Sequence, residues 1–191
     1  MQIILASASP RRRELMEMLC PGSLRICPAK GPERADPALP PDQLVMALSR
    51  HKAEEVAAAY AAAEDVVIGA DTVVALDGAI LGKPKDEADA RRMLRALSGR
   101  SHSVYTGVTV IRGGQTLCHA ERTEVRFRTL EDDEIDRYIA TGEPMDKAGA
   151  YGAQGRASLF VERLDGDFFN VMGLPLCALG KLLKQLGVNL L

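Results

Sequence analysis

The sequence contains no tryptophan, and aromatic residues make up only 4% of its 191 positions. Proteins that bind single-stranded nucleic acid stack bases on aromatic side chains, and few such side chains are present here. A basic surface is also lacking, because 24 basic and 26 acidic residues give a net charge of −2. These shortages argue against DNA or RNA as a partner.

Cysteine, histidine and long apolar runs are scarce as well. The four cysteines show no C-x-x-C spacing and no secretory segment precedes them, so neither a disulfide framework nor a zinc site is predicted. His51, His102 and His119 are too scattered to suggest a metal site or a Ser-His-Asp triad. No apolar run approaches the roughly 18 residues that span a bilayer. We therefore expect a protein of the reducing cytoplasm with no membrane partner.

Apolar residues are plentiful, at 47% of the chain, which is enough for one sizeable core. Neither an internal repeat nor a linker rich in proline and serine divides the sequence. We predict a single domain over residues 1–191, within which two lobes are possible. With so small a net charge, any basic cluster must act locally, which favours a small phosphorylated ligand.

The first such cluster follows an apolar strand at the start of the chain. Ser9 is a good N-cap, and Pro10 suits the first helical position because it lacks the N–H that would be unpaired there. Backbone N–H groups and the helix dipole would favour an anion above Ser7, and Arg11 and Arg12 add forked donors that match phosphate oxygens. An ordinary capped surface helix with a basic first turn is the alternative.

A second cation is predicted on the next helix, over residues 42–63. Projecting its apolar residues at 100° per residue places Lys52 in the middle of the apolar stripe. A lysine on an inward face needs an anionic partner. Lys52 either binds a ligand or has a structural role. In the structural role its aliphatic part packs on the core while the ammonium reaches solvent or pairs with a carboxylate at the core edge.

A carboxylate interrupts the run from Val66 to Leu76, whose β-branched, nearly continuous apolar character is typical of a strand buried on both faces. Asp71 would be costly to desolvate unless it is paired, protonated or bound to a cation. Gly69 and Ala70 leave room beside it for a ligand. We interpret Asp71 as the leading catalytic candidate, with a structural ion pair as the alternative.

A tight turn at Asp77 and Gly78 brings the chain back to Gly82 and Lys83. Lys83 should then lie near the end of the strand that carries Asp71. A carboxylate and a lysine joined by one hairpin can build a metal-phosphate site, although a plain salt bridge between them is also possible.

Small residues dominate positions 146–155, which we interpret as too rich in them to be core. Such a loop lets a ligand approach the backbone, and the amide of Gln154 can both donate and accept toward a base edge.

A helix capped by Asp86 is also expected, with an apolar stripe at Ala90, Met93, Leu94 and Leu97. The expected strands are a short one at 24–27, a hairpin of residues 104–111 and 116–128, and a pair around Phe160 and Phe169. A Pro-rich loop at 28–41, a helix at 132–140 and a helix from Leu174-Pro175 to Gly187 complete the prediction.

Seven short motifs occur in one order along the chain: SASPRR (7–12), KA (52–53), GADTVV (69–74), GKP (82–84), SVYTGV (103–108), DKAGAYG (146–152) and NVMGLP (170–175). Together they closely resemble the Maf-like nucleoside triphosphate pyrophosphatases, over essentially the whole chain. The resemblance implies an α/β fold with an elongated, mixed, twisted sheet flanked by helices, two lobes and a central nucleotide cleft. This fold is related to that of the inosine triphosphate pyrophosphatases.

The same resemblance implies hydrolysis of a nucleoside triphosphate to the monophosphate and pyrophosphate with a divalent cation, Mg²⁺ or Mn²⁺. Asp71 matches the family's active-site carboxylate. Arg11, Thr72 and Gln154 match positions linked to substrate choice in the branch that acts on dTTP and UTP. The residues expected to bind the substrate are Ser7, Arg11, Arg12, Lys52 and Lys83.

The metal is expected on Asp71 and Glu33. One departure from the family concerns Glu33, because the loop that usually offers two acidic residues reads Gly31-Pro32-Glu33-Arg34 here. Only Glu33 can therefore be carried over.

Several alternatives stay open. The sister branch of the family acts on 7-methyl-GTP, and a regulator of cell division could bind nucleotide without turnover, although it would not need Asp71. The substrate could also be a modified pyrimidine nucleotide, and family members are often homodimers.

Overall fold

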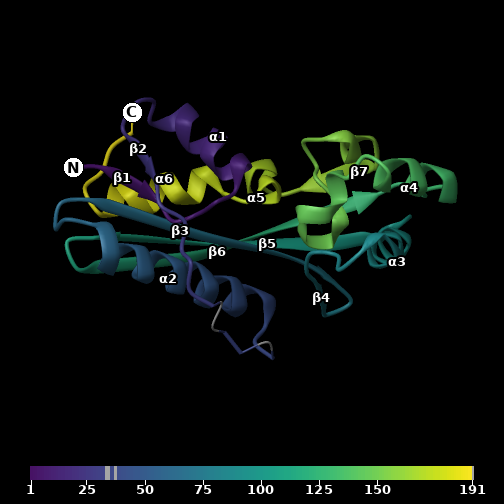
Figure 1. Ribbon diagram of the computed structural model, residues 1–191, viewed down its shortest axis with the longest axis horizontal. Helices are drawn as coiled ribbons and strands as arrows, with labels where there is room; N and C mark the ends of the chain where they lie inside the picture. The colour runs from purple at the N-terminus through teal and green to yellow at the C-terminus, as the bar shows by residue number, and fades with distance from the viewer. Residues whose placement is uncertain (33–34, 37, 191) are drawn as a thin grey trace. The chain divides into compact units, whose positions relative to one another are not determined.

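The computed structural model describes residues 1–32, 35–36 and 38–190 (Figure 1). Across this part of the chain, strands form a mixed sheet in the order β2-β1-β3-β5-β6-β7, with β4 paired to β3. The strands are β1 (Ile3–Leu5), β2 (Leu24–Ile26), β3 (Val66–Leu76), β4 (Ala79–Leu81), β5 (Ser101–Arg112), β6 (Gln115–Phe127) and β7 (Val161–Asp165). The mixed α/β class predicted from the sequence is confirmed.

Six α-helices and three short 3₁₀ helices are found in the described residues. The α-helices are α1 (Pro10–Leu19), α2 (Pro41–Tyr60), α3 (Glu87–Leu97), α4 (Asp132–Ile139), α5 (Phe168–Met172) and α6 (Leu176–Gln185). The 3₁₀ helices are η1 (Glu143–Asp146), η2 (Ala148–Ala150) and η3 (Arg156–Leu159). None of the helices in the described ranges is long and apolar enough to cross a membrane.

The chain divides into two compact units. The first comprises residues 1–71, 106–121 and 173–191, and the second comprises residues 72–105 and 122–172. In the first unit β1 lies between β2 and β3 and is parallel to both. Helices α1 and α6 cover one face of these strands, and α2 covers the other (Figure 1).

Helix α2 packs directly on the strands because glycines face it. A Cβ on Gly69 of β3 would lie 2.3 Å from the carbonyl oxygen of Ser49, and one on Gly107 of β5 would lie 2.2 Å from that of Val45. Side chains from alternate strand positions complete this contact with the helix, since Ile4, Ala6 and Val67 share a buried cluster with Ala53 and Val56. Lys52 is carried by the part of α2 that touches β3 most closely.

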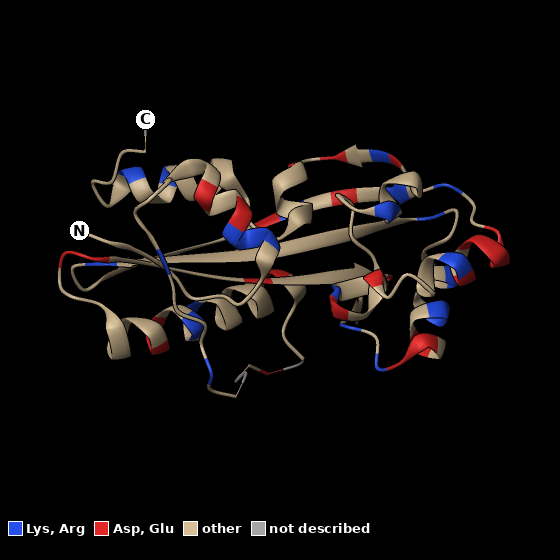
Figure 2. Ribbon diagram, turned by 45° about the horizontal axis from the view of Figure 1, so that its top comes forward, with Lys and Arg blue, Asp and Glu red and all other residues tan. Residues whose placement is uncertain are grey.

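In the second unit, β3 and β4 form the predicted hairpin, with Val74 opposite Leu81. The apolar stripe predicted for the helix after Asp86 is confirmed, since all four residues are buried in one cluster with Ile135, Tyr138 and Ile139 of α4. Outside this core, α3 and α4 each carry both acidic and arginine side chains (Figure 2), and Arg95 of α3 pairs with Asp132 of α4 at 2.6 Å.

Two predictions for this unit are wrong. The expectation that residues 146–155 lie outside the core is wrong, because Ala150, Tyr151 and Ala153 are buried in it. Their small size serves close packing: a Cβ on Gly149 would lie 2.9 Å from the side chain of Val74. No strand forms around Phe169, which lies in the short helix α5 and whose N–H donates to the Asp167 carboxylate at 2.8 Å.

We expect Gly69→Ala to destabilise the first unit, because the added methyl group meets backbone that cannot yield without moving α2. The free energy of unfolding should fall by about 3 kcal/mol, as for overpacked cores. Urea unfolding of the variant measures this. The matched control is Gly82→Ala, where a Cβ would meet open space; equal stability of the two variants would contradict the close approach of α2.

His102 of β5 gives the second unit a pH-dependent stability. Its ring is buried, its Nε2 lies 2.8 Å from the Tyr151 hydroxyl, and burial lowers its pKa from 6.5 to about 4. Between these two values the unfolded chain binds a proton that the folded chain does not, so stability is lost as the pH falls from 6.5 toward 4.

From this histidine we expect a loss of roughly 3 kcal/mol in the free energy of unfolding at the acid end of that window. Denaturant unfolding at a series of pH values should show a shallower slope in His102→Asn than in the wild type. Parallel slopes would mean that His102 has the same pKa in the folded and unfolded states.

Candidate active site

An ion pair joins the two residues that the sequence marks as buried charges. The Nζ of Lys52 donates to Oδ1 of Asp71 at 2.5 Å, and the two side chains are 18% and 14% exposed. Asp71 lies two positions after Gly69, on the same face of β3, and Lys52 lies between Ser49 and Ala53 on α2. The close packing at Gly69 therefore brings the lysine within reach of the carboxylate.

Asp71 is thus paired with Lys52. Taking these charges out of water is costly, and their mutual attraction offsets part of that cost. An ammonium has three donors and a carboxylate has several acceptor positions. Such a pair can therefore keep its mutual hydrogen bond and still contact a phosphate or a cation.

The start of α1 forms as predicted. Ser9 is the N-cap and its Oγ accepts from the Arg12 N–H at 3.5 Å, with Pro10 at the first helical position. The buried Oγ of Ser7 accepts from the Ser9 N–H at 3.2 Å. The expectation that the N–H groups after Ser7 face a ligand is therefore wrong for Ser9 and Arg12, whose N–H groups bond within the segment itself.

Arg12 connects three parts of the first unit. Its Nε donates to the carbonyl of Gly173 at 2.7 Å, and its Nη1 donates to the carbonyl of Ala70 at 2.8 Å and to the Ser7 Oγ at 3.2 Å. The guanidinium thus ties the start of α1 to the residue next to Asp71 and to the segment before α6. Sequence reasoning predicted that Arg12 binds the substrate but missed this bracing role, because two of its three acceptors are backbone carbonyls far away in the chain.

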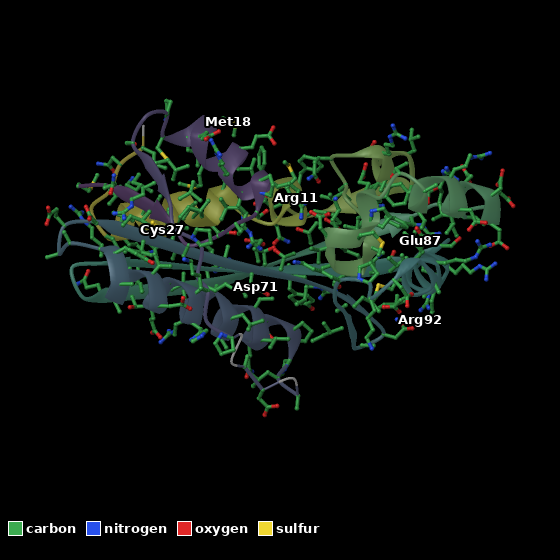
Figure 3. The ribbon with its side chains drawn as sticks, in the orientation of Figure 1. Arg11, Met18, Cys27, Asp71, Glu87 and Arg92 are labelled. Atoms are coloured by element: carbon green, nitrogen blue, oxygen red, sulfur yellow. The ribbon has the colours of Figure 1, made fainter. Side chains whose placement is uncertain are left out.

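The other two arginines of this helix differ in their surroundings. Arg11 lies at the start of α1 and Asp71 lies on β3, in the same unit (Figure 3). Arg13 points to the surface, where its Nε pairs with Glu17 at 2.7 Å. Of the three, Arg11 and Arg12 stay candidates for phosphate binding.

The remaining predicted site residues lie elsewhere. Thr72, Lys83 and Gln154 belong to the second unit. Thr72 is half-buried on β3, and Lys83 and Gln154 are exposed. Thr72 directly follows Asp71 in the chain, whereas the approach of Lys83 and Gln154 to Asp71 stays a prediction. Glu33 lies outside the described residues.

The chain is similar to known proteins over its whole length. The family profile described as "Maf-like protein" matches residues 2–186. The dTTP/UTP pyrophosphatase of Agathobacter rectalis is 52% identical, with 98% of each chain covered, and that of Thermococcus gammatolerans is 48% identical, with 99% of this chain and 98% of the relative covered.

A solved structure shares the fold. The HAM1 protein from Coxiella burnetii matches with a TM-score of 0.55 at 15% sequence identity, over 97% of this chain and 99% of that one. The family match and the identities above are far more specific than this likeness, and they agree with the resemblance that the sequence motifs carry. The chain belongs to the Maf-like protein family.

Proposed function

We propose that the chain hydrolyses dTTP and UTP to the nucleoside monophosphate and pyrophosphate. The observation that carries the proposal is the half-buried Lys52–Asp71 pair, which places a lysine and a carboxylate side by side in the unit that also holds the basic start of α1. The substrate choice is supported by the two relatives at 48% and 52% identity, each of which is named a dTTP/UTP pyrophosphatase.

Charge governs the chemistry of this reaction. Attack of water at the α-phosphorus builds negative charge on the nonbridging oxygens and on the departing pyrophosphate, so cations and exact positioning lower the barrier more than covalent chemistry does. Lys52 and Arg11 are the cations we assign to the phosphates, together with Lys83 of the second unit. Arg12 holds the start of α1 against the Ala70 carbonyl and so positions Arg11.

Asp71 is the residue we assign to the attacking water or to a metal ion. In the described part of the chain, no group of three or more His, Cys, Asp or Glu side chains could hold a metal. The donor chemistry nevertheless fits Mg²⁺, which is commonly bound by one or two carboxylates together with substrate phosphates and water. Asp71 would hold it, with Glu33 as the second candidate, and the ion would neutralise phosphate charge. Lys52 fixes the orientation of the Asp71 carboxylate in either role.

Gln154, Thr72 and Arg11 are the residues we assign to substrate choice. Uracil and thymine both present an N–H donor next to a carbonyl acceptor, and the amide of Gln154 can accept from the first and donate to the second. Cytosine presents the opposite pattern at these positions. We also propose a reducing compartment such as the cytoplasm, which is compatible with four free cysteines.

Turnover of a nucleotide panel with Mg²⁺ tests the proposal. We expect pyrophosphate release from dTTP and UTP at a higher kcat/KM than from CTP, GTP or 7-methyl-GTP. A preference for 7-methyl-GTP would assign the chain to the sister activity, and tight nucleotide binding without pyrophosphate release would make it a regulator.

Asp71→Asn removes the charge of the carboxylate while keeping its size. We expect pyrophosphate release from UTP to fall by roughly a thousandfold, as for loss of a residue that handles a proton, with a near-UV circular dichroism spectrum like that of the wild type. Asp77→Asn is the matched control, since Asp77 is an exposed aspartate after the same strand and pairs with Arg100. A fully active Asp71→Asn protein would refute the catalytic assignment.

A further inference from the structure

Gln154 lies in a tight turn that follows a buried segment. The Gly155 N–H donates to the Gly152 carbonyl at 3.0 Å, which closes the turn around Ala153 and Gln154. Gly152 and Ala153 are buried, whereas Gln154 is exposed. The Gln154 side chain is therefore exposed to solvent on a turn whose first two residues are buried.

Two linked side chains hold this turn from either side. The Tyr138 hydroxyl accepts from the Gly152 N–H at 3.2 Å, and the Glu143 carboxylate accepts from the Arg156 N–H at 3.1 Å. The same hydroxyl donates to the Glu143 carboxylate at 3.0 Å. We call these two residues the Tyr138–Glu143 clasp. The clasp bonds the N–H of Gly152, the first residue of the turn, and the N–H of Arg156, which directly follows the turn.

The clasp is itself held in place. Tyr138 is buried on α4, with its ring against Phe160 at 5.1 Å between centroids. Glu143 begins η1, and its carbonyl accepts from the Nζ of Lys147 at 2.6 Å. The two groups therefore approach the turn from segments anchored in the core of the second unit.

The glycines at both ends of the turn make this grip possible. A Cβ on Gly155 would lie 2.3 Å from the Glu143 carboxylate, and one on Gly152 would lie 2.7 Å from the Lys147 side chain. Glycine is also the residue with the most backbone freedom. Two glycines give the ends of this turn more backbone freedom than other residues would, so we expect its conformation to depend on the clasp.

We propose that the Tyr138–Glu143 clasp positions Gln154 for substrate selection, a role that rests on the proposed dTTP and UTP pyrophosphatase function. A side chain ordered before binding loses less conformational entropy when it contacts the base, so its hydrogen bonds contribute more to affinity. The clasp residues do not touch the base; they act through the Gln154 turn. Loosening the clasp should reduce selectivity for uracil over cytosine and leave the phosphate chemistry largely intact.

Tyr138→Phe is the sharpest test, because it removes one hydroxyl and keeps the ring that packs in the core. We expect the ratio of kcat/KM for UTP to that for CTP to fall three- to tenfold, the range expected for loss of about one hydrogen bond. The change should appear mainly as a higher KM for UTP with kcat nearly unchanged. Hydrogen exchange at the Gly152 and Arg156 amides should be faster than in the wild type.

Tyr151→Phe is the matched control. Tyr151 is also buried in this core, but its hydroxyl bonds to His102 and not to the turn. We expect it to keep the wild-type UTP to CTP ratio even where it lowers stability. Equal loss of selectivity in the two variants would overturn the clasp, since a general loosening of the core would then explain both.

Gln154→Ala shows whether the clasp acts through Gln154. We expect the single variant to lose selectivity and the double variant Tyr138→Phe/Gln154→Ala to match it, because without the amide nothing remains to be positioned. An additive loss would overturn the proposal, as would wild-type selectivity in Gln154→Ala. In both of these cases the proposed function would stand as long as the wild-type protein releases pyrophosphate from UTP. A wild-type protein that releases none would overturn both the proposed function and the clasp.

Glu143→Gln and Glu143→Ala add a graded comparison. The glutamine keeps an oxygen that can accept from the Arg156 N–H, and the alanine does not. Selectivity should fall less in the glutamine variant, and an equal fall in both would contradict a hydrogen-bonding role for Glu143.

Discussion

The approach of α2 to the sheet at Gly69 is the contact on which the catalytic assignment depends. A side chain there would collide with the carbonyl of Ser49, so glycine alone lets the helix backbone lie against the strand. That proximity sets the distance between Lys52 and Asp71, because strand alternation places Gly69 and Asp71 on one face of β3 and helical spacing places Ser49, Lys52 and Ala53 on one face of α2. The ion pair is thus a consequence of backbone packing.

The backbone of β3 next to Asp71 is held by a different interaction. The carbonyl of Ala70 accepts from the guanidinium of Arg12. Two neighbouring residues of β3 are therefore held by two different helices. Lys52 of α2 bonds the Asp71 carboxylate, and Arg12 of α1 bonds the Ala70 carbonyl. Because the acceptors of Arg12 include main-chain carbonyls, their positions follow from the fold itself and do not need particular side chains. The basic start of α1 combines a bracing arginine, Arg12, with a second one, Arg11, that we assign to phosphate.

Local patterns were sufficient to predict most elements, because each depends on residues near one another in sequence. The Ser9 cap, the stripe of α3 and the strand interrupted by Asp71 are of this kind. The sequence also marked Lys52 and Asp71 as charges in apolar surroundings, but it gave no means of pairing them, since their partnership depends on the packing at Gly69. The acceptors of Arg12 could not be predicted for the same reason, and Glu33 stays a prediction outside the described residues.

The wrong prediction for residues 146–155 has a physical cause. Their small side chains were interpreted as excluding them from the core and as giving a ligand access, although a missing side chain makes room for any neighbour, including the chain's own Val74. The number of glycines alone cannot show whether the space serves a ligand or the packing of the chain itself. The atoms that surround each Cβ position do show this. At Gly155 the space is filled by the Glu143 carboxylate, so the glycine serves the grip on the turn and not the ligand directly. Substrate selection can then depend on residues that never meet the substrate, because a base-reading side chain is only as selective as the backbone that holds it.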